Sequence, residues 1–214
     1  MRKITASAFV SLDGIMQAPG GPEEDTSGGF EHGGWIVPYW HDALAEALEA
    51  IFAKPFDLLL GRRTYDIFAA HWPHVATEPG SDGYDPGEAG IATKFNSAVK
   101  HVATHSPDTL DWANSRWLGA DVAAAVSALK QGDGADLLVQ GSSVLLQTLL
   151  ARDLLDELRL FIFPVTFGRG KRLFGEGTRP RAFEARDSRV APNGVIIATY
   201  VPAGDVRTGS FALE

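Results

Sequence analysis

The stretch DLLVQGSSVLLQTLLA, residues 136–151, decides the class of fold. Its first five residues form a short apolar run that fits a buried strand, and residues 142–151 fit a helix that follows directly. Gly141 supplies the turn between the two. A strand that leads through a glycine turn into a helix is typical of α/β sheets, so we expect an α/β protein.

The same alternation of strands and helices is expected along the rest of the chain. The expected strands are residues 3–12, 57–60, 99–104, 115–118, 136–140 and 158–165, followed by β-like segments at 181–188 and 195–201. The expected helices are residues 42–54, 64–70, 121–130 and 142–151. Pro192-Asn193-Gly194 is a hairpin signal. These elements predict a single domain over residues 1–214, with a mostly parallel central sheet flanked by helices and a C-terminal antiparallel hairpin.

Three segments are expected to lack regular structure. Residues 17–38 contain three Gly-Gly pairs, and residues 73–90 are rich in glycine, proline and acidic residues. Residues 203–214 form a C-terminal tail. Because residues 17–38 directly follow the first strand, we expect them to form a lid over the substrate, with a static surface loop as the alternative.

The composition excludes several classes of protein. The 214 residues carry 19 Lys and Arg against 27 Asp and Glu, and this formal charge of -8 disfavours a nucleic-acid partner. The chain has no cysteine, which excludes thiol nucleophiles and cysteine-ligated metals, so redox chemistry needs a cofactor. The apolar runs are too short to span a membrane, and the N-terminus lacks a signal-peptide core. We therefore expect a cytoplasmic protein with no membrane partner.

Polar groups that suit a phosphate follow two of the expected strands. Gly141 precedes two serines at the start of a helix, where free backbone N–H groups and the positive end of the helix dipole meet. The alternative is a plain glycine turn with a serine N-cap. Residues 104–107, Thr-His-Ser-Pro, add hydroxyl groups after the third strand. Open α/β sheets bind ligands at such strand ends.

A pair of arginines follows a third strand. Gly61 ends the strand at residues 57–60, and Arg62 and Arg63 come directly after it. Arginines at a helix N-terminus are repelled by the dipole, so an anion is expected beside them. The alternative is a surface ion pair with Asp66.

Four short motifs occur in a fixed order along the chain. They are Ser11-Leu12-Asp13-Gly14, Gly61-Arg62-Arg63-Thr64-Tyr65, Gln140-Gly141-Ser142-Ser143 and Asp156-Glu157-Leu158-Arg159-Leu160. With these motifs the chain resembles the dihydrofolate reductase-like superfamily, and more closely the branch of the reductase domain of the bacterial bifunctional riboflavin-biosynthesis deaminase-reductase. The similarity covers roughly residues 3–202, and the deaminase half with its zinc-binding cysteines is missing.

The resemblance implies that NADPH lies along the strand ends. Arg62 and Ser106 would hold the 2′-phosphate. The pyrophosphate would be held by Arg63 and Thr64, with Gly61, on one side and by Gly141, Ser142, Ser143 and Val144 on the other. The end of the first strand, with Phe9, Val10 and Met16, would lie against the nicotinamide.

The substrate is expected to be a small heterocycle, either a pyrimidine or pterin-like ring or a sugar-amine attached to one. Asp13, Trp35 and Tyr39 are the expected substrate contacts, with core or lid packing as the alternative for the aromatic rings. Asp42, near the start of the first helix, is the candidate catalytic proton donor. An ordered water is the alternative donor, and helix capping is the alternative role for Asp42. The spacing from Asp42 to the Gly-Arg motif differs from that of dihydrofolate reductases, which puts pterin specificity in doubt.

The expected function is an NADPH-dependent reductase that transfers a hydride to such a substrate, similar to riboflavin-pathway pyrimidine reductase and dihydrofolate reductase. A non-catalytic nucleotide-binding module with the same fold is the alternative. The six histidines show no ligand spacing, so no metal is expected. A homodimer is expected because related domains look dimeric and because residues 158–165 form a long apolar strand with Phe161 and Phe163 on one side.

Overall fold

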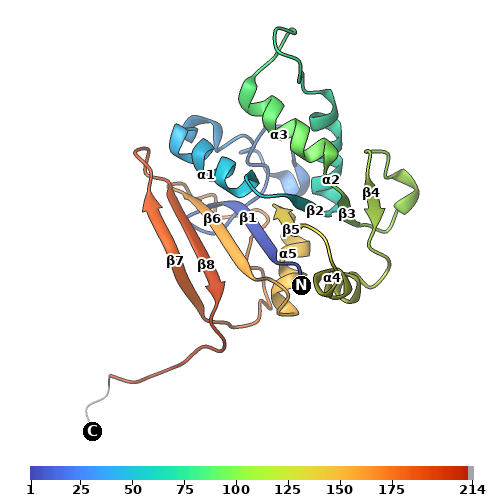
Figure 1. The fold of residues 1–214 in the computed structure, drawn as a ribbon. Coiled ribbons are helices and arrows are strands. Elements are labelled where there is room, and N and C mark those ends of the chain that lie inside the picture. The colour runs from blue at the N-terminus through green and yellow to red at the C-terminus, as the bar shows by residue number, and fades with distance from the viewer. Residues whose placement is uncertain (212–214) are drawn as a thin grey trace.

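A central sheet of eight strands organises the molecule, for which a computed structural model describes residues 1–211 (Figure 1). The strand order is β4-β3-β2-β5-β1-β6-β8-β7. Neighbours from β4 to β6 are parallel, whereas β8 is antiparallel to β6 and β7. The strands are β1 Ile4–Ser11, β2 Phe56–Gly61, β3 Lys100–Ala103, β4 Ser115–Trp117, β5 Asp136–Gln140, β6 Glu157–Phe163, β7 Phe183–Val190 and β8 Ile196–Pro202. The predicted fold class, a mostly parallel sheet with a C-terminal antiparallel hairpin, is confirmed.

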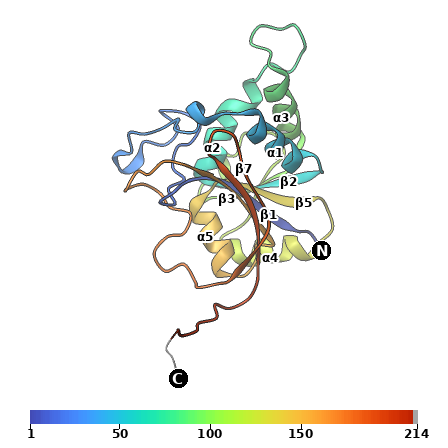
Figure 2. The same ribbon diagram turned by 90° about the vertical axis from the view of Figure 1, so that its left-hand side faces the viewer.

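Helices cover both faces of this sheet (Figure 2). The helices α1, α2 and α3 lie on one face, and α4 and α5 lie on the other. Their bounds are α1 Asp42–Phe52, α2 Arg62–His71, α3 Pro86–Ser97, α4 Val122–Gln131 and α5 Ser143–Ala151. Short 3-10 helices occur at η1 Ser27–Gly29, η2 Val37–Tyr39, η3 Trp72–His74 and η4 Pro107–Thr109. None of the helices within residues 1–211 has the length and apolar character needed to cross a membrane.

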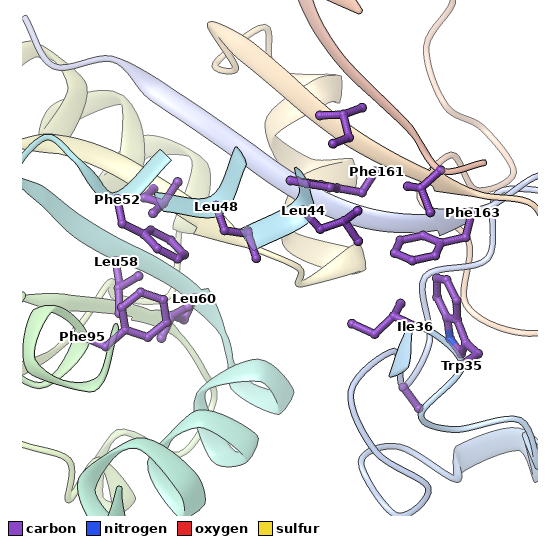
Figure 3. Packing of buried hydrophobic residues seen from close by; sticks show 14 of the residues in the cluster. Trp35, Ile36, Leu44, Leu48, Phe52, Leu58, Leu60, Phe95, Phe161 and Phe163 are labelled. Carbon is purple, nitrogen blue, oxygen red and sulfur yellow. The ribbon is translucent and has the colours of Figure 1, made fainter. Parts of the chain in front are cut away.

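The larger core lies between α1 and the sheet (Figure 3). Leu44, Leu48 and Phe52 recur at helical spacing and form the buried side of α1. They pack toward Phe161 and Phe163 of β6, which are completely buried. Each such side chain stabilises the fold by about 1.5–3 kcal/mol through burial. The start of α1 is therefore fixed at the carboxyl end of β6.

This packing corrects one argument for a dimer. Phe161 and Phe163 lie inside the core of their own chain, so they offer no face to a partner. The other side of the strand is covered as well, since Leu158 and Leu160 belong to the core under α4 and α5. A strand buried on both faces reads as a nearly continuous apolar run, and this explains the length of that run in β6.

The segment from residue 73 to residue 90 is shorter as a loop than expected. Helix α3 begins at Pro86, where the Asp85 side chain accepts a hydrogen bond from the Glu88 N–H at 2.9 Å. The prediction of a loop as far as residue 90 was wrong because two glycines in the first turns of α3 mask a good capping signal. The predicted tail, 203–214, follows β8, and its residues 212–214 lie outside the described residues.

Candidate functional site

Two helices begin side by side at the carboxyl edge of the sheet. The neighbouring strands β2 and β5 end at this edge and lead into α2 and α5. The Gly61 N–H donates to the Ser142 hydroxyl oxygen at 2.9 Å, and that hydroxyl donates to Thr64 Oγ1 at 2.7 Å. A Cβ at Gly61 would lie only 3.3 Å from the Ser142 side chain. Glycine therefore lets the two helix starts approach this closely.

Neither of these helix starts is capped by a side chain. The N-cap residues are Gly61 for α2 and Ser142 for α5, and no side-chain capping bond is formed at either. By contrast, His41, Asp85 and Asp121 accept capping hydrogen bonds at α1, α3 and α4. The first N–H groups of a helix have no partner inside it, and they carry the positive end of the dipole. Two uncapped starts therefore leave donors for an anion in one place.

The alternative for the serine turn was a plain turn with a serine cap, and the Ser142 side chain does not cap α5. Gly141 and Ser142 both adopt positive φ angles, 69° and 65°. In that conformation the Ser142 hydroxyl bonds to Gly61 and Thr64 instead of capping its own helix. Ser143 is half-buried, and Val144 is 75% exposed on the first turn of α5. The turn thus presents its backbone and an exposed side chain at the strand end.

Arg62 lies at the first position of α2 and makes four close contacts. Its Nε donates to both carboxylate oxygens of Asp66, at 2.8 and 3.0 Å. Its Nη1 donates to the Thr109 hydroxyl at 2.6 Å and to the Ser106 carbonyl at 3.1 Å. The hydrogen bond and the charge of Asp66 raise the pKa of Arg62. The predicted pair of Arg62 and Ser106 is therefore in contact, and so is the pair with Asp66 that was its alternative.

Sequence reasoning did not single out Thr109. It lies at the end of η4 and donates its hydroxyl hydrogen to the Ser106 carbonyl at 3.0 Å. Thr104 adds to this turn because its hydroxyl oxygen accepts the Ser106 N–H at 3.0 Å. The hydroxyl-rich segment after the third strand is thus folded into a turn against Arg62.

Arg63 connects the helix start to the long loop at residues 17–38. Its Nη2 donates to the Glu24 carbonyl at 2.8 Å, and it lies 3.9 Å from the Asp25 carboxylate. Burial raises the pKa of Asp25, but the hydrogen bonds from Lys171 and Ser27 outweigh this, and the pKa is lowered overall. An ionised, buried carboxylate thus stands between two cations at the edge of the site.

The loop itself is anchored from within. Gln17 donates to the carbonyls of Asp25 and Ser27 at 3.0 and 2.8 Å, and the Trp35 indole donates to the Gln17 carbonyl at 2.8 Å. Phe30 and Trp35 are buried in the larger core. This describes one packed arrangement of the loop, and its expected movement as a lid stays a prediction.

The end of β1 supplies the apolar part of the edge. Phe9 is half-buried and packs against the rings of Phe161 and Phe163. Val10 and Met16 are buried in the core under α5. These residues lie on β1 and just after it, and β1 is the direct neighbour of β5. Of the three, Phe9 is the most accessible to a ligand.

Two buried polar atoms beside this edge were not singled out from the sequence. Ser7 of β1 and Gln140 of β5 are register partners. The Ser7 hydroxyl and the Gln140 side-chain nitrogen are buried, and neither has a hydrogen-bond partner in the described chain. An unpaired buried polar atom costs free energy, so this position favours a water or a ligand group that completes it. No sequence pattern marks such a pair, because the register of β1 and β5 creates it.

Two predicted substrate contacts have structural roles. The Asp13 carboxylate accepts hydrogen bonds from the Ser11 hydroxyl at 2.6 Å and from the Gly168 N–H at 2.7 Å. Burial raises the pKa of Asp13, but these bonds lower it by more. Trp35 is 7% exposed and packs edge-on to Phe163, so the core-packing alternative describes it. Tyr39 is half-buried and also packs against Phe163.

Asp42 is exposed at the first turn of α1. Its alternative role as the N-cap was wrong, because His41 holds that position and its ring nitrogen accepts the Ala43 N–H at 3.1 Å. The side chain of Asp42 is therefore not used for capping. It lies close in sequence to Leu44, which packs near Phe163 at the carboxyl end of β6 (Figure 3).

The chain is similar to known proteins over most of its length. A family model described as the RibD C-terminal domain matches residues 2–197. A Bacillus subtilis (strain 168) protein, described as uncharacterized protein YyaP, is 24% identical over 200 residues, which cover 93% of this chain and 94% of that protein.

Solved structures share the fold at low sequence identity. A pyrimidine reductase-like protein from Corynebacterium diphtheriae is 15% identical with a TM-score of 0.59, over 95% of this chain and 93% of that one. A diaminohydroxyphosphoribosylaminopyrimidine deaminase/5-amino-6-(5-phosphoribosylamino)uracil reductase from Thermotoga maritima is 17% identical with a TM-score of 0.56. The match covers 94% of this chain but only 57% of the Thermotoga protein.

Proposed function

The chain belongs to the RibD C-terminal domain family, and we propose that it is an NADPH-dependent reductase that transfers a hydride to a small heterocycle. One observation carries the proposal. Two adjacent helix starts at the carboxyl edge lack side-chain caps, and Arg62 stands at one of them. The fold shared with a pyrimidine reductase-like protein and with the Thermotoga deaminase/reductase supports the choice of reductase.

The residues at this edge fit a dinucleotide phosphate. The backbone of Gly141 and Ser142 and the start of α2 offer N–H donors to the pyrophosphate. Gly141 leaves room for this approach, since a Cβ there would meet only Thr64 Oγ1, at 3.9 Å. Arg62 and Ser106 would hold the 2′-phosphate, and Phe9 would contact the nicotinamide. When bound, the cofactor supplies the hydride.

The protein's own residues would position and protonate the substrate. Ser7 of β1, the strand that carries Phe9, and Gln140 of the neighbouring β5 offer a buried hydroxyl and a buried amide, and they suit the polar edge of a heterocycle. Asp42 is the proposed proton donor, because it is the acidic residue of the first turn of α1, near the carboxyl end of β6. The substrate class is a pyrimidine or pterin-like ring, or a sugar-amine attached to one.

A homodimer in the cytoplasm is part of the proposal. It rests on the resemblance to reductase domains, since the apolar side of β6 is internal. Sedimentation at micromolar concentration is expected to give twice the chain mass. A monomer under these conditions would contradict the homodimer, while the proposed reductase activity would stand.

The proposal is tested by binding and turnover in the same preparation. NADPH is titrated first, and its oxidation is then followed by absorbance with a phosphorylated ribosylaminopyrimidine and, separately, with dihydrofolate. Oxidation that depends on one of these substrates is the expected result. Tight NADPH binding without oxidation by either would favour the non-catalytic nucleotide-binding module. Failure to bind NADPH would overturn both functions.

A further inference from the structure

The Arg62 guanidinium is bonded through two of its nitrogens, Nε and Nη1, and its third nitrogen, Nη2, still has N–H donors. Nε is bonded to the Asp66 carboxylate, and Nη1 is bonded to Thr109 and Ser106. A guanidinium has five N–H donors in one rigid plane. Within residues 1–211, no hydrogen bond is formed by Nη2 of Arg62. Its two N–H groups are therefore available to a ligand.

Asp66 fixes this arrangement from the same helix. It lies four residues after Arg62 on α2, which brings the two side chains together on one helix face. The side chains are 35% and 43% exposed, and an exposed ion pair contributes little to stability. Thr109 and Ser106 hold the guanidinium from the other side, on the segment after β3. Arg62 thus bridges two separate elements, and among the described residues its salt bridge is with Asp66 alone.

We propose that Asp66 is a positioning residue, which keeps the free Nη2 edge of Arg62 ready for the 2′-phosphate and so sets the preference for NADPH over NADH. This inference rests on the proposed function. An arginine side chain has many rotamers, and immobilising such a side chain on binding typically costs about two- to twelvefold in affinity. Asp66 removes that cost before the cofactor arrives.

The charge of Asp66 acts in the opposite direction, and this makes the inference testable. A carboxylate next to the 2′-phosphate repels it. If charge alone mattered, removal of Asp66 would strengthen NADPH binding, whereas loss of positioning weakens it. Asp111 provides a matched control: it is exposed, it acts on Arg62 through its charge, and it forms no hydrogen bond with it. Arg62, Asp66 and Asp111 line the same surface pocket of about 700 Å³.

The experiment compares dissociation constants for NADPH and NADH in the wild type and five variants of the full chain. Asp66→Ala is expected to weaken NADPH by about three- to tenfold and to leave NADH unchanged. Asp66→Asn keeps an oxygen that can accept from Nε, so it is expected to retain the wild-type ratio. Asp111→Ala is expected not to weaken NADPH. In an Arg62→Ala background, Asp66→Ala is expected not to weaken NADPH further, because the positioning effect of Asp66 acts through Arg62.

Four results would overturn the inference. NADPH binding that becomes tighter in Asp66→Ala would mean that repulsion dominates. Equal weakening of NADPH and NADH would mean that Asp66 only supports the fold. An unchanged ratio in Asp66→Ala, with wild type still preferring NADPH, would reject positioning while the proposed function stands. Wild type that binds neither nucleotide would overturn the proposed function, and this inference with it.

Discussion

The α-helices of the described chain differ at their N-termini. Helices α1, α3 and α4 are closed by the side chains of His41, Asp85 and Asp121. Helices α2 and α5 begin after Gly61 and Ser142 with no side-chain cap. The two uncapped helices follow neighbouring strands, β2 and β5. Capping typically contributes about 1 kcal/mol per helix, and its absence at these two adjacent positions leaves N–H donors for the proposed nucleotide.

Ser142 shows how the difference arises. Serine is a preferred N-cap residue, yet its hydroxyl accepts the Gly61 N–H and donates to Thr64. The side chain that could close α5 instead joins it to the start of α2. In the capped group, Asp121 accepts the Ala124 N–H at 3.0 Å, a bond to its own helix. Capped starts stabilise their own helix, whereas the uncapped pair leaves its N–H groups for the proposed nucleotide.

The largest effect is expected from a residue of the capped group. Asp42 lies in the first turn of α1, whose cap is His41, so Asp42→Asn leaves the cap intact. We expect kcat to fall by about a hundredfold, because general acid catalysis contributes on that order, while the dissociation constant for NADPH stays unchanged. Steady-state turnover and NADPH titration check this. Full kcat in Asp42→Asn would mean that the proton comes from water.

The next largest effect is expected at the uncapped start of α2. Arg62→Ala is expected to weaken NADPH by about ten- to a hundredfold, because a charge-assisted contact contributes roughly 1.5–3 kcal/mol, and to change NADH hardly at all. Titration of both nucleotides measures this. Arg186→Ala, at an exposed arginine on β7, is the control and should change neither. Equal losses for both nucleotides, or none, would contradict the role of Arg62.

A pair of glycines sharpens the comparison at α5. Gly141 and Gly119 both have positive φ angles, 69° and 85°, so alanine at either position should destabilise the fold by about 1 kcal/mol. Only Gly141 lies at the proposed pyrophosphate site. We therefore expect Gly141→Ala to weaken NADPH by about tenfold and Gly119→Ala to leave it unchanged. Equal NADPH affinities in the two variants would exclude close approach at Gly141.

The smallest effect is expected from removal of a cap. Asp121→Ala should lower the free energy of unfolding by about 1 kcal/mol, since the Ala124 N–H loses its acceptor. NADPH affinity should not change, because α4 follows β4, and β3 separates that strand from β2 and β5 in the sheet. Denaturant unfolding and NADPH titration of the same variant test both parts. A loss of NADPH affinity as large as the loss of stability would break the distinction between the two groups of helices.

Much of the fold could be predicted from the sequence because its signals are local. The strand at 136–140 and the hairpin at 192–194 follow from apolar runs and turn residues, and the structure has both. Helix α3 was missed because Gly87 and Gly90 lower its helical propensity, although Asp85, Pro86 and Glu88 form a helix-start signal. Tertiary packing of Phe95 on α1 overrides that weak propensity.

The site could be predicted only in part, because sequence shows which groups follow the strands but not how they pair. Arg62 and Ser106 lie in contact, whereas their expected binding of a 2′-phosphate stays a prediction. Thr109 was missed, since its contact depends on the fold of η4. Ser7 was missed and Gln140 was named only as part of a turn motif, since only the register of β1 and β5 makes them neighbours. Asp13 was an expected substrate contact, and in the structure its carboxylate accepts a hydrogen bond from the Gly168 N–H.

The central claim is that the uncapped edge binds a dinucleotide whose 2′-phosphate meets Arg62. Parallel titration of the wild-type protein with NADPH and NADH tests it most directly. The account predicts that NADPH binds about ten- to a hundredfold more tightly than NADH, as expected for charge-assisted bonds that NADH cannot form. Equal affinities for the two nucleotides would contradict the assignment of Arg62 and Ser106 together.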